Sequence, residues 1–413
     1  MTSLTRGRTT ERRTGTVRPA RACPVCVGTA ADVLHTERMV LPAGHPLTSG
    51  YDVVCCRGCG FVFADTAVPQ AEYDRFYAEL SKYADEATGT GGGYQAWDDR
   101  RLEAMAATIA KAVPDRAARI VEVGCANGGL LRWLVSLGYR NVVGVDPAPA
   151  CVRRAAAVQG ARAFVGTLFD MPGEAMDADC VVLSHVLEHV QDVRGALHGM
   201  RAALRRGGAI YVEVPDATRY AEFPTAPFQD FNTEHINHFS RASLQNALEA
   251  AGFAVRWTAA KLIEAAAGVP YPACYAVAQR TDAPTRPTHD GTLRPAIEAY
   301  VRMSEAGMAR LAAEVESLVP PHETVIVWGV GQTTFKLLAR TALGGARIAA
   351  FADTSATYHG HTLRGVPIIA PSALHDLPPH PILVGSLVNR ASILESIRRL
   401  GLPNDVHMLG APA

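Results

Sequence analysis

The sequence has no imbalance of charge and no long apolar run, and both absences narrow the classes of protein to which it can belong. Its 413 residues carry 40 basic and 40 acidic side chains, so we do not expect a nucleic-acid partner. No stretch of about eighteen apolar residues occurs, and the N-terminal residues lack the apolar core of a secretory signal. We therefore expect a cytoplasmic protein that has no membrane-spanning segment.

The length predicts more than one packed unit. A chain of 413 residues is about two to three times a typical domain, so two or three domains are expected. Hydrophobic residues make up 48% and charged residues 19%, which is typical of an ordinary globular protein. The first 22 residues are rich in arginine and poor in acidic residues, and we interpret them as a disordered tail, although an organelle transit peptide has a similar composition.

Four of the nine cysteines form two Cys-x-x-Cys pairs near the N-terminus. In a cytosolic chain, clustered cysteines are more often metal ligands than disulfide partners. Each pair can direct two thiolates at one ion, and the segment between the pairs is long enough to bring the second turn beside the first. We predict a structural zinc site on Cys23, Cys26, Cys56 and Cys59. Cys55 is an alternative to Cys56, and four reduced core cysteines are the plainer interpretation.

Short apolar strands alternate with helical patterns in the middle of the chain, which is typical of a parallel, doubly wound α/β sheet. The predicted strands are Arg119–Val123, Asn141–Val145, Ala163–Val165, Ala178–Ser184 and Ala209–Val214. A stretch rich in Pro, Thr and Asp at 281–294 predicts a linker. Beyond it, a long amphipathic helix over Ile297–Val319 and further short strands predict a second, smaller α/β unit.

A glycine-rich turn follows the first of these strands and lets a ligand approach the backbone. Gly124 and Gly128 are four residues apart, and Glu122 precedes the first of them by two. A dinucleotide-binding turn needs the closer GxGxxG spacing, so this spacing favours S-adenosylmethionine. Asp146 ends the next strand, where an acidic residue can accept hydrogen bonds from both ribose hydroxyls. A turn aspartate at a strand end is the plainer interpretation.

Two later segments supply further candidate cofactor residues. Leu168 and Phe169 follow the third strand, and their side chains are candidates to enclose an adenine ring. His185 and His189 follow the fourth strand four residues apart, so they face the same way if the segment is helical. We assign Leu168, Phe169 and His185 to the cofactor site. Surface or capping histidines are the plainer interpretation of the pair.

These motifs divide the chain into five segments. We expect a disordered tail at 1–22, a zinc-binding domain at 23–85, a class I methyltransferase Rossmann-like domain at 86–280, a linker and helix at 281–310, and a smaller Rossmann-like domain at 311–413. In the last segment, Gly329 and Gly331 form a second glycine-rich turn and Asp353 closes the following strand. This turn either meets the phosphates of a nucleotide-linked substrate or is a scaffold feature with no ligand.

This order of modules resembles the sugar C-methyltransferase family, whose members act on nucleotide-linked 4-keto deoxysugars. The resemblance extends over nearly all of residues 23–413 and rests on the paired Cys-x-x-Cys turns, the Val-Glu-Val-Gly turn and the segment 232–240. The family's Tyr-x-Glu-His motif matches Glu234 and His235, which implies that they bind the sugar and manage its protons. Asn232 stands where the tyrosine is usual, and His189 resembles the family's histidine after the fourth strand.

The resemblance implies methyl transfer from S-adenosylmethionine to the carbon beside the ketone of a nucleotide-linked sugar, in antibiotic or cell-surface sugar biosynthesis. His189 or His235 is then the base, and the other histidine and Asn232 are candidates to hold the ketone oxygen. Glu234 is expected to orient a histidine or to bind a sugar hydroxyl.

Two alternatives remain open at this point. The first is O- or N-methylation of a sugar or small natural product, with which the replaced tyrosine is compatible. The second is a repurposed, non-catalytic scaffold that binds S-adenosylmethionine, and the intact Glu122, Gly124, Gly128 and Asp146 argue against it.

Overall fold

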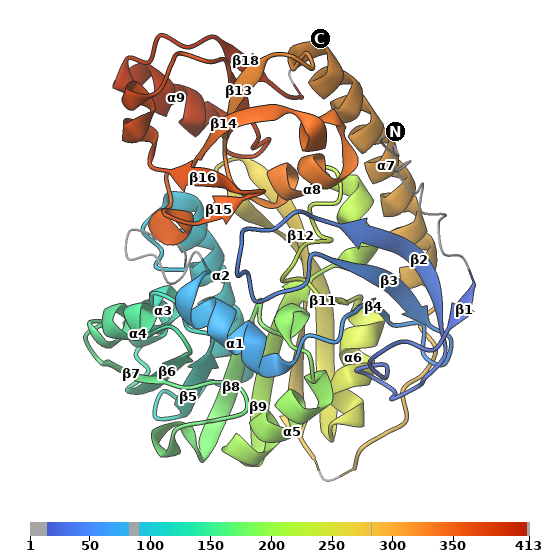
Figure 1. Ribbon diagram of the computed structural model, residues 1–413. Coiled ribbons are helices and arrows are strands. Elements are labelled where there is room, and N and C mark those ends of the chain that lie inside the picture. The colour runs from blue at the N-terminus through green and yellow to red at the C-terminus, as the bar shows by residue number, and fades with distance from the viewer. Residues whose placement is uncertain (1–14, 82–90, 282, 411–413) are drawn as a thin grey trace.

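The computed structural model describes residues 15–81, 91–281 and 283–410. These residues form three sheets with their helices: an N-terminal module, a central domain and a C-terminal domain (Figure 1). No helix within the described ranges is long and apolar enough to cross a membrane.

The N-terminal module is built on a sheet of order β1-β2-β3-β4-β10, in which each neighbouring pair is antiparallel. The fifth strand, β10, comes from the central domain, where Asn237 pairs with Phe63 and His238 with Val62. The loop that precedes β10 is therefore fixed to the N-terminal module. The elements are β1 (Thr16–Val17), β2 (Ala31–Arg38), β3 (Gly50–Cys56), β4 (Val62–Asp65), α1 (Gln70–Glu79) and β10 (Asn237–His238).

Ordered structure begins before residue 23, so the prediction of a disordered tail at 1–22 is wrong for its last part. Thr16 pairs with Asp32 at the edge of the N-terminal sheet, and Arg21 is buried. These contacts depend on partners far along the chain, which the composition of a short segment does not reveal. Residues 1–14 lie outside the described ranges.

The central sheet has the order β11-β12-β9-β8-β5-β6-β7. Its five predicted strands are present and run parallel, and a long antiparallel hairpin that the sequence did not predict adds β11 and β12 at one edge. The strands are β5 (Arg119–Val123), β6 (Asn141–Asp146), β7 (Ala161–Val165), β8 (Ala178–Ser184), β9 (Leu204–Pro215), β11 (Phe253–Ala266) and β12 (Val269–Arg280).

Both faces of the central sheet are covered, which explains the continuous apolar character of its strands. Alternate residues of β5 point to opposite faces: Ile120 packs in a cluster with Leu102 and Leu130, and Val121 packs in another with Leu197. The helices are α2 (Ala96–Ala112), α3 (Gly129–Ser136), α4 (Pro149–Ala156), α5 (Val193–Ala203) and α6 (Arg241–Ala250), and the short 3-10 helices are η1 (Gly173–Ala175), η2 (Leu187–His189) and η3 (Ala217–Glu222).

The C-terminal domain contains the second α/β sheet, of order β15-β16-β14-β13-β17-β18. All its neighbouring strands are parallel except β15 and β16. The elements are β13 (Thr324–Trp328), α8 (Gln332–Arg340), η4 (Ala342–Gly345), β14 (Arg347–Ala352), η5 (Ala356–Tyr358), β15 (Thr362–Leu363), β16 (Val366–Ile369), η6 (Pro371–Asp376), β17 (Ile382–Val384), α9 (Arg390–Leu400) and β18 (Val406–Met408).

One long helix, α7 (Leu293–Leu318), connects the central and C-terminal domains. It runs along the side of the molecule, where it contacts η3, β2 and η4 (Figure 1). The helix is continuous, so the predicted domain boundary between residues 310 and 311 is wrong because it falls inside a packed element.

Candidate functional site

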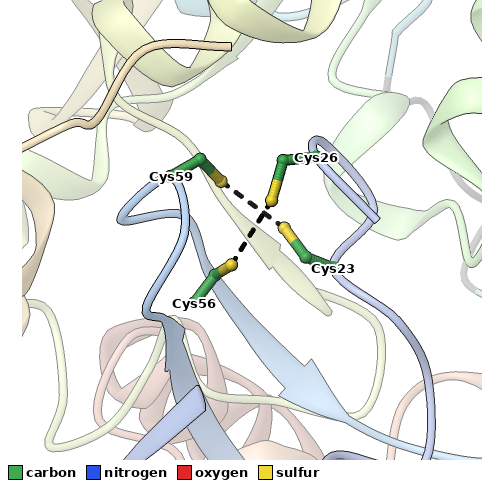
Figure 2. A group of neighbouring side chains, drawn as sticks. All are labelled: Cys23, Cys26, Cys56 and Cys59. Atoms are coloured by element: carbon green, nitrogen blue, oxygen red, sulfur yellow. Dashed lines mark hydrogen bonds between the residues drawn. The ribbon is translucent and has the colours of Figure 1, made fainter. Parts of the chain in front are cut away.

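The four predicted cysteines converge on one point of the N-terminal module (Figure 2). The sulfur atoms of Cys23 and Cys59 are 3.6 Å apart, those of Cys26 and Cys56 are 3.5 Å apart, and all four lie within 4.8 Å of one another. A tetrahedral zinc ion with bonds of about 2.3 Å separates its thiolates by roughly 3.8 Å, so the cluster is compatible with zinc. The Cys55 thiol lies outside the group and faces the Gly60 carbonyl at 3.5 Å, which favours Cys56 in the predicted set.

The predicted linker closes over the second cysteine turn. The Asp290 N–H donates to the Cys59 carbonyl at 2.9 Å. Gly60 has φ +75°, and a Cβ atom at this position would lie 2.2 Å from the Asp290 carbonyl oxygen. Only glycine fits a positive φ this close to the Asp290 backbone. The second cysteine turn and the linker are therefore in direct backbone contact.

The predicted cofactor turn lies at the carboxyl end of β5. Gly124 has φ +80° and Gly128 has φ +78°, values that L side chains rarely adopt. A Cβ atom at Gly128 would lie 2.8 Å from the Ala155 Cα atom, and one at Gly124 would lie 2.7 Å from Val186. Gly128 also precedes the first residue of α3, so the turn presents the N-terminus of a helix, a favourable place for polar ligand groups.

Two buried carboxyl groups flank this turn. Asp146 is 6% exposed, and its two oxygens accept hydrogen bonds from the Ala126 and Ala148 N–H groups, both at 2.9 Å. Glu122 is 4% exposed, and its Oε2 atom has no hydrogen-bond partner among the described residues. Burial raises the pKa of Glu122 to about 8. A buried carboxyl oxygen without a hydrogen-bond partner, beside a turn that only glycine can form, fits a ligand that supplies the missing partner.

Burial also governs the protonation of Asp146. It raises the pKa of this carboxyl above its ordinary value, although the two backbone hydrogen bonds oppose the shift.

Leu168 and Phe169, the residues predicted to enclose the adenine, differ in exposure. Leu168 packs in the hydrophobic core, whereas Phe169 is 43% exposed on the turn after β7. The two side chains expected to enclose an adenine are therefore not equally available, since Leu168 is buried and Phe169 is exposed.

His185 lies between two buried glutamates. Its Nδ1 atom is 3.2 Å from Glu188 Oε1 and its Nε2 atom is 3.3 Å from Glu213 Oε1. Burial opposes the charged ring, but the hydrogen bonds to the two carboxylates outweigh it and raise the pKa of His185. Both ring nitrogens are engaged within the protein, so the predicted role of His185 in cofactor binding stays a prediction.

The predicted acceptor residues lie together. The His189 and His235 rings are 4.9 Å apart between centroids, and the His189 Nδ1 atom is 3.1 Å from the Glu234 carbonyl oxygen. This contact requires a proton on Nδ1, which leaves Nε2 of a neutral His189 ring as a base. Glu188 Oε1 lies 3.8 Å from that Nε2 atom.

Tyr77 of α1 completes this group, which we call the acceptor cluster: Tyr77, His189, Glu234 and His235. The Tyr77 hydroxyl is 3.1 Å from Glu234 Oε2, and its ring centroid is 5.4 Å from that of His189. Tyr77 was not predicted from the sequence, because it belongs to the N-terminal module and reaches the cluster only through tertiary packing.

Asn232 shapes the loop on which the cluster depends. Its Oδ1 atom accepts hydrogen bonds from the Glu234 and His235 N–H groups, both at 2.8 Å, and its Nδ2 atom donates to the Gln229 carbonyl at 3.1 Å. Both ends of the carboxamide are therefore used within the loop, and the predicted contact of Asn232 with the acceptor stays a prediction.

Residues 94–257 match the family model described as a methyltransferase domain. The chain contains an S-adenosylmethionine-dependent methyltransferase domain. Its fold is the α/β class I methyltransferase fold, because five parallel strands are followed by an antiparallel pair at one edge. The matched residues of the methyltransferase domain include the glycine turn, Asp146 and three members of the acceptor cluster. Tyr77, β12, α7 and the C-terminal domain lie outside the match.

Known proteins are similar to the methyltransferase domain over limited stretches. The ubiquinone biosynthesis O-methyltransferase of Methylocella silvestris is 36% identical over 110 residues, which are 25% of this chain and 43% of that protein. The mitochondrial enzyme of the same name from Homo sapiens is 26% identical over 175 residues, or 38% and 46% of the two chains. This chain thus spans less than half the length of either relative.

Among solved structures, the 1,6-didemethyltoxoflavin N1-methyltransferase of Burkholderia thailandensis is 19% identical to the chain. The similarity covers 54% of this chain and 96% of that one, with a TM-score of 0.39.

Proposed function

We propose that the protein transfers a methyl group from S-adenosylmethionine to a small molecule bound at the acceptor cluster. The observation that carries the proposal is the shared edge of the central sheet. Gly124 follows β5 and His189 follows β8, and these neighbouring strands are parallel, so both residues lie at their carboxyl ends. In open α/β sheets, ligands bind at that edge.

The cofactor half of the site is built from Glu122, the two glycines and Asp146. In this proposal Asp146 accepts hydrogen bonds from ribose hydroxyls, and the glycines leave room for the ligand beside the backbone. Once bound, S-adenosylmethionine supplies an electrophilic methyl group. The protein must then place a nucleophilic acceptor in line with it and remove the acceptor's proton.

His189 is the base that the geometry favours. Its Nδ1–H is directed at the Glu234 carbonyl, so its Nε2 atom is free to take a proton from the acceptor. The Glu188 carboxylate, 3.8 Å from Nε2, stabilises the imidazolium that forms. His235 is then a donor for an acceptor oxygen, and Glu234 binds an acceptor hydroxyl while the Tyr77 hydroxyl donates to its carboxylate and fixes it.

Methylation of a hydroxyl is the first candidate reaction. The curated relatives are named ubiquinone biosynthesis O-methyltransferases, which fits O-methylation, the first of the alternatives considered from sequence, better than a sugar C-methyltransferase. A hydroxyl acceptor also needs only one positioned base, a requirement that His189 meets without help.

Methylation of a carbon beside the ketone of a nucleotide-linked deoxysugar is the second candidate. One contact favours it: Gln332 Nε2, at the start of α8, donates to Thr233 Oγ1 at 3.0 Å. The glycine-rich turn that precedes α8 therefore lies against the acceptor loop. Asp353 accepts a hydrogen bond from Val330 N–H at 2.6 Å and braces that turn. The N-terminus of α8 is a favourable place for a phosphate attached to the acceptor.

A panel of acceptors separates the two reactions. Purified protein would be incubated with methyl-labelled S-adenosylmethionine and either catechols and other small hydroxyl compounds or nucleotide-linked 4-keto sugars. The product mass and the position of the label would then be determined. Label on oxygen supports the first candidate, and label on carbon supports the second. No label transfer to any hydroxyl compound or sugar contradicts the proposal.

We also propose that the four-cysteine cluster holds a structural zinc ion. Its support is the fit between the observed sulfur separations and tetrahedral thiolate coordination. With four protein ligands, the ion has no open position for chemistry, so its role is to fix the two cysteine turns.

A further inference from the structure

Arg21 is a buried cation in the segment that leads into the first cysteine turn. Its side chain is 9% exposed, and its guanidinium donates only to groups without formal charge. Nε donates to the Ala64 carbonyl at 3.1 Å; Nη1 donates to the Gln191 carbonyl at 3.0 Å and to Gln191 Oε1 at 2.7 Å; Nη2 donates to the Ile236 carbonyl at 2.8 Å and to Asn237 Oδ1 at 3.0 Å. These contacts use all five donor positions of a guanidinium.

The partners of Arg21 lie beside the acceptor cluster on both sides. Gln191 follows His189 by two residues, and Ile236 directly follows His235. The two loops come from distant parts of the methyltransferase domain, and the rigid fork of one arginine spans both. A lysine cannot reproduce this contact, because a single ammonium lacks the planar set of donors.

The N-terminal module reinforces the same two loops at other points. Ala64 N–H donates to the Ile236 carbonyl at 2.9 Å, and Gln191 N–H donates to Gln70 Oε1 at 2.8 Å. Arg21 is the member of this set that contacts both loops at once. Burying a guanidinium is costly unless every donor is satisfied. Here Nη1 and Nη2 bind the two loops, and Nε binds the Ala64 carbonyl of β4.

We infer that Arg21 is a positioning residue for the acceptor cluster: by bridging Gln191 and Ile236 it adds to the direct hydrogen bonds between the two loops and so helps to fix the separation and orientation of His189 and His235. The N-terminal module then contributes to methyl transfer by holding this geometry, although it lies outside the matched methyltransferase domain. The inference rests on the proposed function for its catalytic consequence, whereas the geometric claim can be tested without any acceptor.

The test uses the full-length protein and two substitutions at Arg21. Arg21→Met keeps most of the side-chain volume and removes all donors, and Arg21→Lys keeps the charge without the fork. Arg18→Met is the matched control, since Arg18 is an exposed arginine of the same segment. Metal content and the affinity for S-adenosylhomocysteine would show whether the fold and the cofactor site survive.

The first readout is the NMR spectrum of protein labelled with ¹³C in its histidine rings. Signals of His189 and His235 would be identified from their loss in His189→Ala and His235→Ala. We expect both signals to shift in Arg21→Met, to shift less in Arg21→Lys and to stay in place in Arg18→Met. The second readout is label transfer to the panel of acceptors, where Arg21→Met should lower kcat at least about tenfold with S-adenosylhomocysteine affinity unchanged within about twofold.

The outcomes separate the two ideas. Unchanged histidine signals in a folded Arg21→Met or Arg21→Lys protein overturn the positioning role. Shifted signals together with no label transfer by the unsubstituted protein leave the positioning role in place and overturn the proposed function. If Arg21→Met does not fold, the Arg21→Lys spectrum decides the matter, because this variant retains the buried charge.

Discussion

Replacing Glu122 with glutamine should stabilise the ligand-free protein by an amount that grows as the pH rises. Burial, with a smaller contribution from the Asp146 charge, raises the pKa of Glu122 from 4.5 to about 8. The native protein therefore keeps this proton up to about pH 8, whereas the unfolded chain loses it near pH 4.5. Between these values the native state binds more protons than the unfolded state, so its stability falls as the pH rises.

The size of the effect follows from the shift. Each unit of pKa difference corresponds to about 1.4 kcal/mol. At pH 7 Glu122 is ionised in the unfolded chain but not in the native protein, which favours unfolding. The free energy of unfolding is therefore about 3 kcal/mol lower than it would be with a group that cannot ionise. Glutamine has nearly the same shape but carries its own desolvation cost. The diagnostic quantity is thus the difference in the free energy of unfolding between Glu122→Gln and the unsubstituted protein, measured as a function of pH.

Hydrogen exchange of the β5 amides, compared at the same pH, reports the free energy of the opening that exposes the central sheet. Between pH 5.5 and pH 7, the free energy of unfolding of Glu122→Gln relative to that of the unsubstituted protein should increase by about 2 kcal/mol. Glu103→Gln is the control, because Glu103 is exposed on α2, and its difference from the unsubstituted protein should not vary with pH. If the stability difference between Glu122→Gln and the unsubstituted protein is likewise independent of pH, the reasoning is refuted.

Three further outcomes are expected. Protein purified without chelators should contain about one equivalent of zinc, and Cys56→Ser with Cys59→Ser should reduce it; less than half an equivalent in the unsubstituted protein contradicts the zinc site. Asp146→Ala should weaken S-adenosylhomocysteine binding by roughly 1–3 kcal/mol in calorimetry, because buried donors lose their acceptor; unchanged affinity removes Asp146 from the site. Tyr77→Phe should lower the rate of methyl transfer but not S-adenosylhomocysteine affinity, because Glu234 loses its phenolic donor; an unchanged rate excludes Tyr77.

The central sheet was predictable because its strands are buried on both faces. Such strands are short continuous apolar runs with clear ends, and the bounds of β5 and β8 are those expected. The hairpin of β11 and β12 was missed, since β11 is the edge strand and its side chains alternate less clearly. The helix α7 was expected, but its start and the domain boundary placed within it depend on packing.

The cofactor and acceptor residues differ in how far the sequence reveals them. Gly124 and Asp146 lie at the ends of predictable strands, so their proximity follows from topology. Tyr77 reaches Glu234 across 157 residues, and Arg21 reaches Ile236 across 215. Contacts of this kind are determined by how the N-terminal module docks, and no local pattern encodes them. Because of this docking, β10 belongs to the sheet of the N-terminal module, although the strands before and after it in the sequence belong to the central sheet.

The acceptor cluster is tested most directly by single-turnover methyl transfer in His189→Ala, His235→Ala and Glu234→Gln, with the affinity for S-adenosylhomocysteine measured for each variant. Loss of the base should lower the rate about 10²- to 10⁴-fold, with the largest effect in His189→Ala, while cofactor affinity stays nearly intact in all three. Wild-type turnover in every variant, or cofactor affinity that collapses together with the rate, would contradict the assignment of these side chains to the acceptor.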